Sequence, residues 1–225
     1  MTSSVLSVVA IDGPSGAGKS TVAARVAAAL HLDVLDTGAM YRALTLAVLE
    51  RGIDVDDADA CARIAREVQL NVGPPVILDG RDVSRDIRGP VVTAAVSSVS
   101  AHTGVRSVLV ERQRAWVEER GAGVVEGRDI GTVVFPDAAV KVFLTASDEE
   151  RARRRQRDEE AAERQVGVEH VREELDRRDR LDSTRAVSPL RPAHDALIVD
   201  TTTRSVDDVV DEIVERYRIV TKTLR

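Results

Sequence analysis

The 225-residue sequence predicts an α/β fold, in which a parallel sheet is covered by helices on both faces. Two observations carry this prediction. Apolar runs without polar alternation recur along the chain and are separated by helical patterns, which is typical of buried parallel strands. Near the N-terminus, the apolar run 8–12 leads into a glycine-rich loop, 13–18, which opens onto the alanine-rich segment 22–30.

The glycine-rich loop reads Gly-Pro-Ser-Gly-Ala-Gly-Lys-Ser-Thr and has the chemistry of a phosphate-binding loop. Glycines let the backbone turn tightly and point its N–H groups at an anion, and the helix that begins near Lys19 adds its positive end. Lys19 is expected to reach the β- and γ-phosphates of a nucleotide, and the Ser20 hydroxyl to bind Mg²⁺. The expected nucleotide contacts are Gly13, Pro14, Ser15, Gly16, Ala17, Gly18, Lys19, Ser20 and Thr21.

After the loop, predicted strands and helices alternate at first, and a stretch of short strands and tight turns follows. Residues 32–35 predict a short apolar strand, and 38–51 shows an apolar face at helical spacing. The acidic run that begins at Asp54 predicts another helix, to about Glu67. Residues 68–88 then contain short apolar runs joined by Gly-Pro-Pro and Asp-Gly turns, which predicts a small β insertion.

The second half of the chain returns to long helices and buried strands. Pro90 is suited to the first position of a helix through about Ala101, and another helix follows over 105–120. Ser147 is expected to cap a helix with an acidic first turn, which Gly167 breaks. The remaining predicted elements are strands at 124–126, 140–144 and 196–199 and helices at 171–180 and 206–218.

Composition restricts the partners of the chain. The net charge of −6 argues against binding a nucleic-acid polymer, and an aromatic content of 2% offers few stacking platforms. No apolar run approaches the roughly 20 residues needed to span a bilayer. The single cysteine, Cys61, and the lack of a signal-peptide pattern predict a reducing, cytoplasmic location.

Charged residues gather where the predicted strands end. Ligands of a parallel sheet bind beyond the carboxyl ends of its strands. This rule places Asp36-Thr37, the run 126–129 and Asp200 on the same rim as the phosphate loop. The rim and the polar helix after it supply Arg42, Arg128, Arg178, Asp182 and Arg185. The four arginines are more cations than one triphosphate needs, and the arginine fork suits phosphate oxygens, so we expect a second phosphorylated substrate.

The sequence excludes one class of nucleotide, the guanine nucleotides. Guanine-binding proteins of this class carry an Asn-Lys-x-Asp signature, and the only asparagine of this chain, Asn71, is not in such a run. A guanine nucleotide is therefore not the expected ligand of the phosphate loop.

Five stretches resemble the bacterial cytidylate kinase family, in order and at similar spacing over nearly the whole chain. The runs Gly-Arg-Asp-Ile-Gly-Thr and Arg-Ala-Val-Ser-Pro-Leu are the specific ones. The resemblance implies a P-loop kinase fold with five parallel strands and a single domain over 1–225. It also implies a monophosphate-binding region at about 37–105, which includes the β insertion 68–88, and a lid at about 151–168. The five stretches are 13–21, 35–42, 112–115, 126–138 and 185–190.

The implied reaction is direct in-line transfer of the γ-phosphate of ATP to CMP or dCMP with Mg²⁺, by a monomer and without a covalent intermediate. Arg42, Arg128 and Arg178 would hold the monophosphate. Lys19 and the lid residue Arg154 would contact ATP phosphates, so the catalytic set is Lys19, Arg128, Arg154 and Arg178.

The resemblance also assigns the residues that bind the nucleoside. Ser97, Arg106 and Asp129 would read the cytosine edge, Asp182 would accept from the ribose hydroxyls, and Arg185 would lie beside the base and phosphate. The chain departs from the family at two positions. Thr37 stands where many members carry Ser, and Glu126, which could hold a Mg²⁺ water, stands where others carry Asp.

Several of these residues also have purely structural interpretations. Asp129 could form a buried ion pair with Arg128, and the arginines of 151–157 could be a solvated helix face. Arg178, Asp182 and Arg185 could be surface partners at helical spacing. Two functional alternatives also stand: a kinase of the same fold acting on UMP or another small molecule, and a nucleotide-binding regulator without transfer activity.

Overall fold

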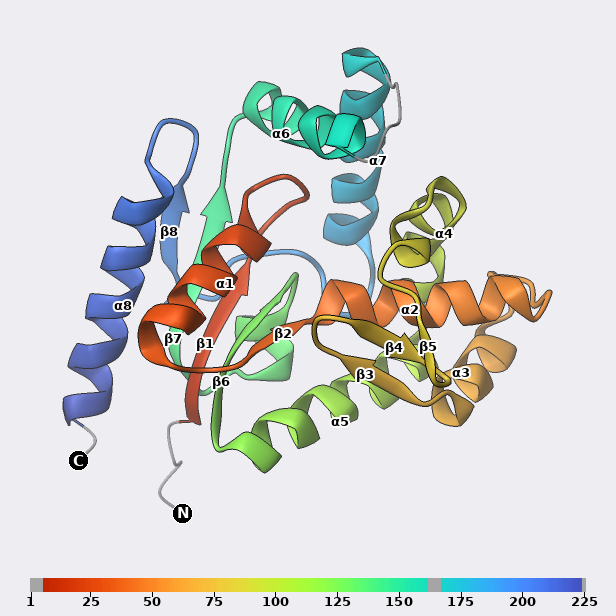
Figure 1. The fold of residues 1–225 in the computed structure, drawn as a ribbon, viewed down its shortest axis with the longest axis horizontal. Helices are drawn as coiled ribbons and strands as arrows, with labels where there is room; N and C mark the ends of the chain where they lie inside the picture. Colours follow the sequence, from red (N-terminus) through yellow and green to blue (C-terminus); the bar gives the residue numbers. More distant parts are fainter. Residues whose placement is uncertain (1–5, 162–166, 224–225) are drawn as a thin grey trace. The chain divides into compact units, whose positions relative to one another are not determined.

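The structure is a computed structural model that describes residues 6–161 and 167–223. These residues form two compact units (Figure 1). The first, here the loop unit, comprises the described residues up to Asp33 and from Ala122 onward. The second, here the middle unit, is Val34–Gly121.

The main sheet has five strands in the order β2-β6-β1-β7-β8. Strand β1 pairs in parallel with β6 on one side and β7 on the other, and β7 pairs in parallel with β8. The predicted five-stranded parallel sheet with flanking helices is therefore confirmed. The strands are β1 (Leu6–Asp12), β2 (Val34–Asp36), β6 (Ala122–Gly127), β7 (Ala138–Thr145) and β8 (Leu197–Asp200).

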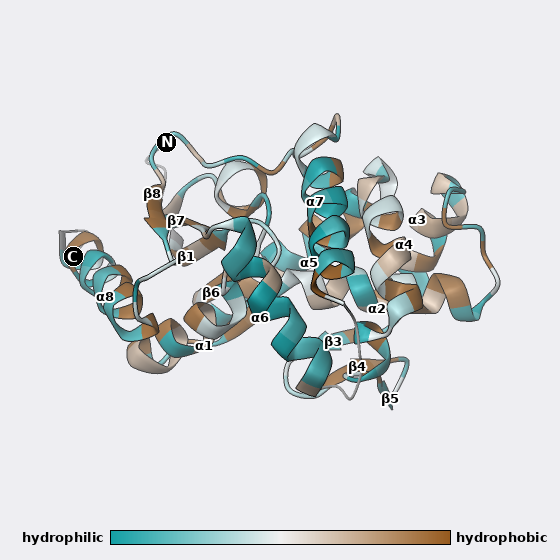
Figure 2. Ribbon diagram, turned by 90° about the horizontal axis from the view of Figure 1, so that it is seen from above, coloured by the Kyte–Doolittle hydropathy of each residue, from teal (hydrophilic) through white to brown (hydrophobic). Residues whose placement is uncertain are grey.

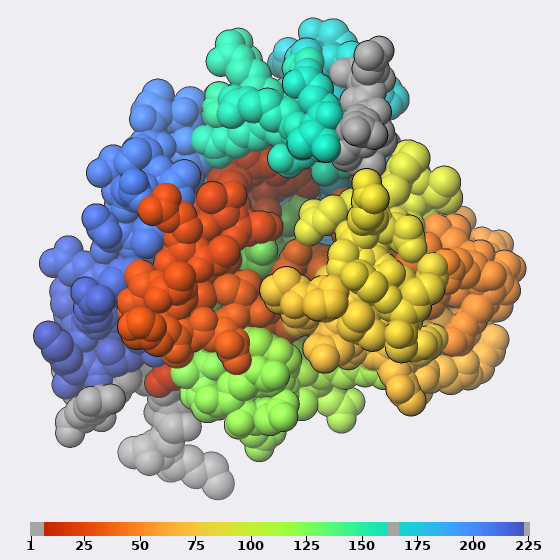
Figure 3. Space-filling model, viewed as in Figure 1, coloured from red at the N-terminus to blue at the C-terminus, as the bar shows by residue number. Residues whose placement is uncertain are grey.

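Four helices belong to the loop unit: α1 (Lys19–Leu30), α6 (Asp148–Ala161), α7 (Val168–Thr184) and α8 (Val206–Thr223). Helices α1 and α8 lie side by side and pack on β6 and β7 respectively (Figures 1 and 3). Strand β1, which lies between β6 and β7, is buried from Val8 to Asp12, and Val8, Val9 and Ile11 are completely shielded from solvent. This core holds the C-terminal end of β1 in a fixed position.

Helices α6 and α7 are mostly hydrophilic (Figure 2) and pack on each other through a small apolar cluster. The cluster consists of Ala152, Val171 and Leu175. Within the predicted lid, 151–168, residues 162–166 lie outside the described residues. Ser147 caps α6 as expected, since its hydroxyl accepts the Glu150 N–H at 3.3 Å.

The middle unit contains α2 (Thr37–Glu50), α3 (Ala58–Glu67), α4 (Pro90–Ala101) and α5 (Thr103–Arg120). The short strands expected within 68–88 form an antiparallel sheet in the order β3-β4-β5, followed by a 3₁₀ turn at Asp86–Arg88. The strands are β3 (Leu70–Val72), β4 (Val76–Leu78) and β5 (Arg81–Asp82).

The start of α3 differs from the prediction. The helix begins at Ala58 rather than at Asp54, because the Asp57 carboxylate accepts the Ala60 N–H at 2.9 Å and acts as the N-cap. The preceding acids instead form a turn, in which Asp54 accepts the Asp56 N–H at 3.0 Å. In the part of the chain that the structure describes, no helix is long and apolar enough to cross a membrane.

Candidate active site

The glycine-rich loop joins the end of β1 to the start of α1 and lies tightly against β7. Gly13 has a φ of 149°, and a Cβ there would stand 2.2 Å from the Leu144 carbonyl oxygen. Gly18, the residue before α1, has a φ of 88°. Only glycine fits the first position, because neither the backbone angle nor the space admits a side chain.

Lys19 is buried at the first position of α1. Its side chain is 8% exposed, and its ammonium donates to the Pro14 carbonyl at 2.8 Å. The pKa of Lys19 is lowered to about 7, chiefly by burial and next by the nearby Arg128, while Glu126 and Asp179 act in the opposite direction. The ammonium is thus held inside the loop, where an added anion would stabilise its charged form.

Ser20 and Glu126 place two oxygen groups side by side. The Ser20 hydroxyl donates to Glu126 Oε2 at 3.0 Å, and Glu126 is 4% exposed at the end of β6. Mg²⁺ prefers oxygen ligands and is usually bound by one or two carboxylates together with substrate phosphates. The donor pair fits that ion. The described residues contain no group of three or more His, Cys, Asp or Glu side chains that could hold a metal.

Asp12, which the sequence analysis did not single out, fixes the segment after β6. Its two carboxylate oxygens accept the backbone N–H groups of Ile130 and Gly131, both at 2.8 Å. Burial raises the pKa of Asp12 to about 6, although the two backbone hydrogen bonds lower it. These bonds hold the start of a π-helical turn, Ile130–Val134, immediately after the predicted site residue Asp129.

Arg128, Asp129, Asp182 and Arg185 form a charged cluster in the loop unit. Arg128 Nε donates to Asp182 at 2.9 Å, and Arg185 lies 3.6 Å from Asp129 and 3.9 Å from Asp182. The side chains of Asp182 and Arg185 are only 11% and 8% exposed. The interpretation of these two residues as surface partners is therefore wrong, because burial makes them an interior network.

Arg178 lies on the buried stripe of α7, seven residues after Val171 and four before Asp182. The pKa of its guanidinium is lowered to about 10, chiefly by burial and next by the nearby Arg128. Arg128 and Arg178 are therefore two cations held close to each other, an arrangement that an anion would stabilise.

The arginines of α6 divide between solvent and the loop. Arg153 pairs with Glu149, and its side chain is 58% exposed, as expected for a solvated face. Arg154 instead donates to the Thr201 hydroxyl and carbonyl at 3.0 and 2.7 Å. A Cβ on Gly18 would stand 3.3 Å from Arg154 Nη1, so Arg154 lies against the glycine loop.

The middle unit holds four of the predicted site residues. Arg42 Nη1 donates to the Ile87 carbonyl at 3.1 Å and to the Thr93 hydroxyl at 2.9 Å. Arg106 is 3% exposed, and its guanidinium lies 5.5 Å from the Tyr41 ring centre. The other two, Thr37 and Ser97, are buried on α2 and α4.

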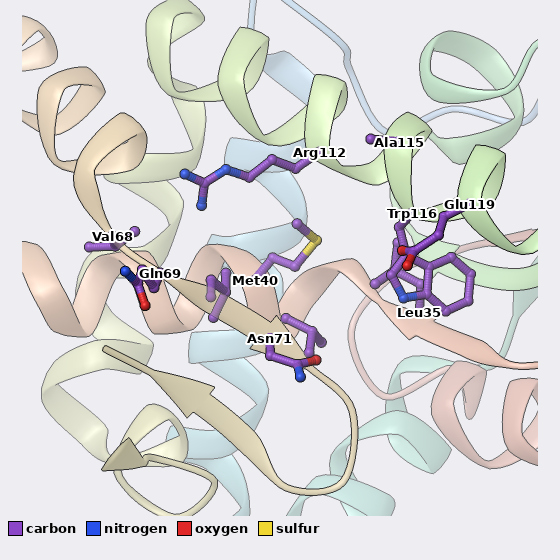
Figure 4. A pocket seen from close by; sticks show the side chains of 11 residues that line it. Leu35, Met40, Val68, Gln69, Asn71, Arg112, Ala115, Trp116 and Glu119 are labelled. Atoms are coloured by element: carbon purple, nitrogen blue, oxygen red, sulfur yellow. The ribbon is translucent and has the colours of Figure 1, made fainter. Parts of the chain in front are cut away.

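The structure thus brings the predicted residues into two groups, one in each unit. The middle unit also has a separate pocket of about 480 Å³, which is lined by residues of α5, such as Trp116, by β3 and by Met40 of α2 (Figure 4). None of the predicted nucleotide contacts lines that pocket.

A five-stranded parallel sheet, a phosphate loop between β1 and α1, and a buried lysine surrounded by arginines together define a P-loop kinase. The chain belongs to the cytidylate kinase family, since the family model for cytidylate kinase matches residues 9–219. The resemblance noted in the sequence is therefore confirmed.

Individual relatives agree with this assignment. The cytidylate kinase of Mycobacterium avium is 54% identical over 216 residues, covering 94% of this chain and 95% of the relative. The bifunctional pantoate ligase/cytidylate kinase of a Synechococcus strain is 51% identical over 219 residues. That match covers 94% of this chain but only 40% of the relative, so the chain spans less than half of the bifunctional proteins.

A solved structure of an uncharacterized protein from Eubacterium ventriosum aligns with a TM-score of 0.54 at 13% identity. It covers 95% of this chain and 99% of the other. This likeness supports the fold.

Proposed function

We propose that the chain transfers the γ-phosphate of ATP to CMP or dCMP, giving ADP and CDP or dCDP. Membership of the cytidylate kinase family supports this reaction. The structural observation that carries it is the number of buried or half-buried cations outside the phosphate loop. Lys19 and Arg154 lie at the loop, and we assign Arg42, Arg128 and Arg178 to a second phosphate.

The proposed mechanism depends on positioning and charge neutralisation. The CMP phosphate oxygen is already a nucleophile, so the reaction needs no general base. Lys19, Arg128, Arg154 and Arg178 would stabilise the charge on the transferring group. Ser20, with Glu126 acting through water, would hold Mg²⁺, which neutralises phosphate charge when bound.

The nucleoside contacts that the family resemblance implies suit the hydrogen-bonding edge of cytosine, which offers one amino donor and two acceptors. A carboxylate can accept from the amino group, and an arginine and a hydroxyl can donate to the acceptors. We assign these roles to Asp129, Arg106 and Ser97. Asp182 would accept from the ribose hydroxyls, and Arg185 would lie near the base and phosphate.

We further propose that residues 151–168 act as a lid, and that Thr37 and Arg42 belong to the monophosphate-binding region 37–105. Closure of such a lid would exclude water, because otherwise ATP would be hydrolysed instead of transferred. The chain is proposed to act in the cytoplasm as a monomer, with ATP, CMP and dCMP as its partners.

The test is a coupled assay of ADP release with CMP, dCMP, UMP or AMP as acceptor. We expect release that depends on CMP or dCMP, and a loss on the order of 10³-fold or more in Lys19→Ala, by analogy with removal of other charge-stabilising groups. A preference for UMP would favour a different kinase of this fold. ATP binding without transfer to any acceptor would favour a regulator.

The base-reading role has its own prediction. Asp129→Ala is expected to lower kcat/KM for CMP far more than it changes ATP affinity, because the carboxylate is assigned to the acceptor base and to no part of ATP. Asp137→Ala, in an exposed turn nearby, is the matched control and should leave both unchanged. Equal losses in CMP use and ATP affinity for Asp129→Ala would contradict the assignment.

A further inference from the structure

Ser15, in the glycine loop, has both of its backbone polar groups bonded by side chains from distant helices. Its N–H donates to Asp179 Oδ1 on α7 at 3.1 Å. Its carbonyl accepts from Arg151 Nη1 on α6 at 3.0 Å. The Asp179 and Arg151 side chains also form an ion pair with each other. These contacts close a ring that fixes the peptide groups on both sides of Ser15.

The ring is shielded from water, so the attraction between its two charges is screened only weakly. The Arg151 side chain is 7% exposed and the Asp179 side chain 16%. A hydrogen-bonded ion pair that is mostly buried is costly to break, because the remaining charge loses its partner. The opposite side of Arg151 is also bonded, since Nη2 donates to Asp148 at 2.7 Å.

The side chain of Ser15 connects the ring to the charged cluster described above. The Ser15 hydroxyl accepts from Arg128 Nη2 at 2.7 Å, and Arg128 Nε donates to Asp182, three residues after Asp179 on α7. One loop residue is therefore linked to α6, to α7 and to the segment after β6.

We propose that Asp179 and Arg151 are positioning residues for phosphoryl transfer. They fix the glycine loop through Ser15 and hold α6 and α7 in register with it. The predicted catalytic residues Arg154 and Arg178 lie on those same helices, so the ring sets where both arginines stand relative to Lys19. This inference rests on the proposed kinase activity but assigns two residues that the family resemblance did not.

The kinetic test compares Asp179→Ala and Arg151→Ala with wild type. We expect kcat to fall by roughly 10²-fold in each, because small misplacements of catalytic groups have effects of that size. KM for CMP should rise by much less, because Arg178 shares the assigned monophosphate contacts with Arg42 and Arg128. Asp179→Asn keeps an acceptor for the Ser15 N–H but loses the charge, so its kcat should lie between those of wild type and Asp179→Ala. Asp176→Asn, on the exposed face of α7, is the matched control and should behave as wild type.

The double variant tests whether the two side chains act as one unit. If they do, Asp179→Ala with Arg151→Ala together should cost about as much as either alone, since the ring is already broken by one substitution. Two independent losses that multiply, or a wild-type kcat in either single variant, would overturn the proposal. A fall in melting temperature with unchanged kcat would mean that the ring only stabilises the fold.

A second measurement does not depend on catalysis. Hydrogen exchange of the peptide that covers residues 13–18 should be faster in Asp179→Ala than in wild type, because the Ser15 N–H loses its acceptor. The control Asp176→Asn should show no change, and unchanged exchange in Asp179→Ala would contradict the geometry. If exchange is faster in Asp179→Ala, but the wild-type chain transfers phosphate to no acceptor, the ring geometry stands and only the proposed function is contradicted.

Discussion

At the scale of single residues, Lys19 illustrates how burial prepares a group for an anionic ligand. Its pKa of about 7 arises chiefly from burial, with Arg128 as the next contribution. The free enzyme therefore carries the ammonium below pH 7 and loses it above. Bound phosphates would restore the charge, so proton uptake and ATP binding are linked at this residue.

The resulting prediction concerns the pH dependence of ATP use. Between pH 7 and 9, kcat/KM for ATP should fall by up to about tenfold per pH unit, because an increasing share of the free enzyme must first bind a proton. The measurement is a pH series at saturating CMP and Mg²⁺. The internal control is kcat/KM for CMP at saturating ATP, in which Lys19 is already paired and this decline should be missing. A flat ATP profile to pH 9 would refute the role.

Asp12, an acidic group, gives a prediction about the pH dependence of stability. Its folded-state pKa, about 6, lies above the ordinary value of 3.8, so the folded chain binds this proton more tightly than the unfolded chain. The contribution to stability is fully present below pH 3.8 and is lost as pH rises through 6. The shift corresponds to about 3 kcal/mol of unfolding free energy.

Asp12→Asn cannot ionise and should lack this dependence. We therefore expect the unfolding free energy of wild type, relative to that of the variant, to fall between pH 4 and pH 7. Urea unfolding of both proteins across that range measures the difference, and parallel curves would show that the burial of Asp12 is compensated. The comparison isolates Asp12 because both proteins share every other titrating group.

At the scale of elements, side-chain caps fix where the functional helices begin. The Asp36 carboxylate accepts the Ala39 N–H at 2.9 Å at the start of α2, which carries Thr37 and Arg42. Asp57 caps α3 in the same geometry, with an equal distance of 2.9 Å. The two helices share a capping mechanism, but only α2 carries predicted substrate contacts.

The two caps therefore make a matched pair for mutation. Asp36→Ala and Asp57→Ala should each lower the unfolding free energy by about 1 kcal/mol, the usual cost of losing an N-cap. Only Asp36→Ala should also raise KM for CMP, because fraying of the first turn of α2 displaces Thr37 and Arg42. An equal rise of KM for CMP in both variants would mean that lost stability alone explains the rise.

Most elements could be predicted because their signals are local. The glycine loop, Pro90 at the start of α4 and Ser147 at the start of α6 each act within one turn of chain. The π-helical turn Ile130–Val134 was missed, because the hydrogen bonds that fix it come from Asp12, more than a hundred residues earlier. Local pattern carries no information about such a partner.

The same limit explains which site residues were overlooked. Arg151 stands in a run of arginines and Asp179 in a run of alternating charges, so neither differs from its neighbours in sequence. Only tertiary contact separates Arg151, 7% exposed, from Arg153, 58% exposed. The phosphate loop and the arginine-rich rim could be predicted because residue type alone distinguishes them.

At the scale of the whole molecule, the predicted ligand contacts divide between the two units. Lys19 and the phosphate loop belong to the loop unit, whereas Arg42, Ser97 and Arg106 belong to the middle unit. The phosphate-loop contacts are assigned to ATP. The middle-unit contacts are assigned to CMP, together with Arg128, Asp129, Arg178, Asp182 and Arg185 of the loop unit. The two ligands should therefore depend on different substitutions.

This separation predicts a double dissociation in ligand-induced thermal stabilisation. A ligand at 100 times its Kd adds about 2.7 kcal/mol to the unfolding free energy, so each should raise the melting temperature of wild type. Lys19→Ala should lose the shift caused by a non-hydrolysable ATP analogue with Mg²⁺ and keep the shift caused by CMP. Arg106→Met, which preserves most of the buried volume, should do the reverse.

Each variant is compared with its own ligand-free melting temperature, which removes any direct effect of the substitution on stability. UMP serves as the specificity control, because its edge carries a carbonyl where cytosine carries the amino group that Asp129 is assigned to accept from. A weaker shift with UMP than with CMP is therefore expected in wild type. Loss of both nucleotide shifts in either variant would mean that the two sets of residues do not act on separate ligands, and the assignment of ATP and CMP to them would fail.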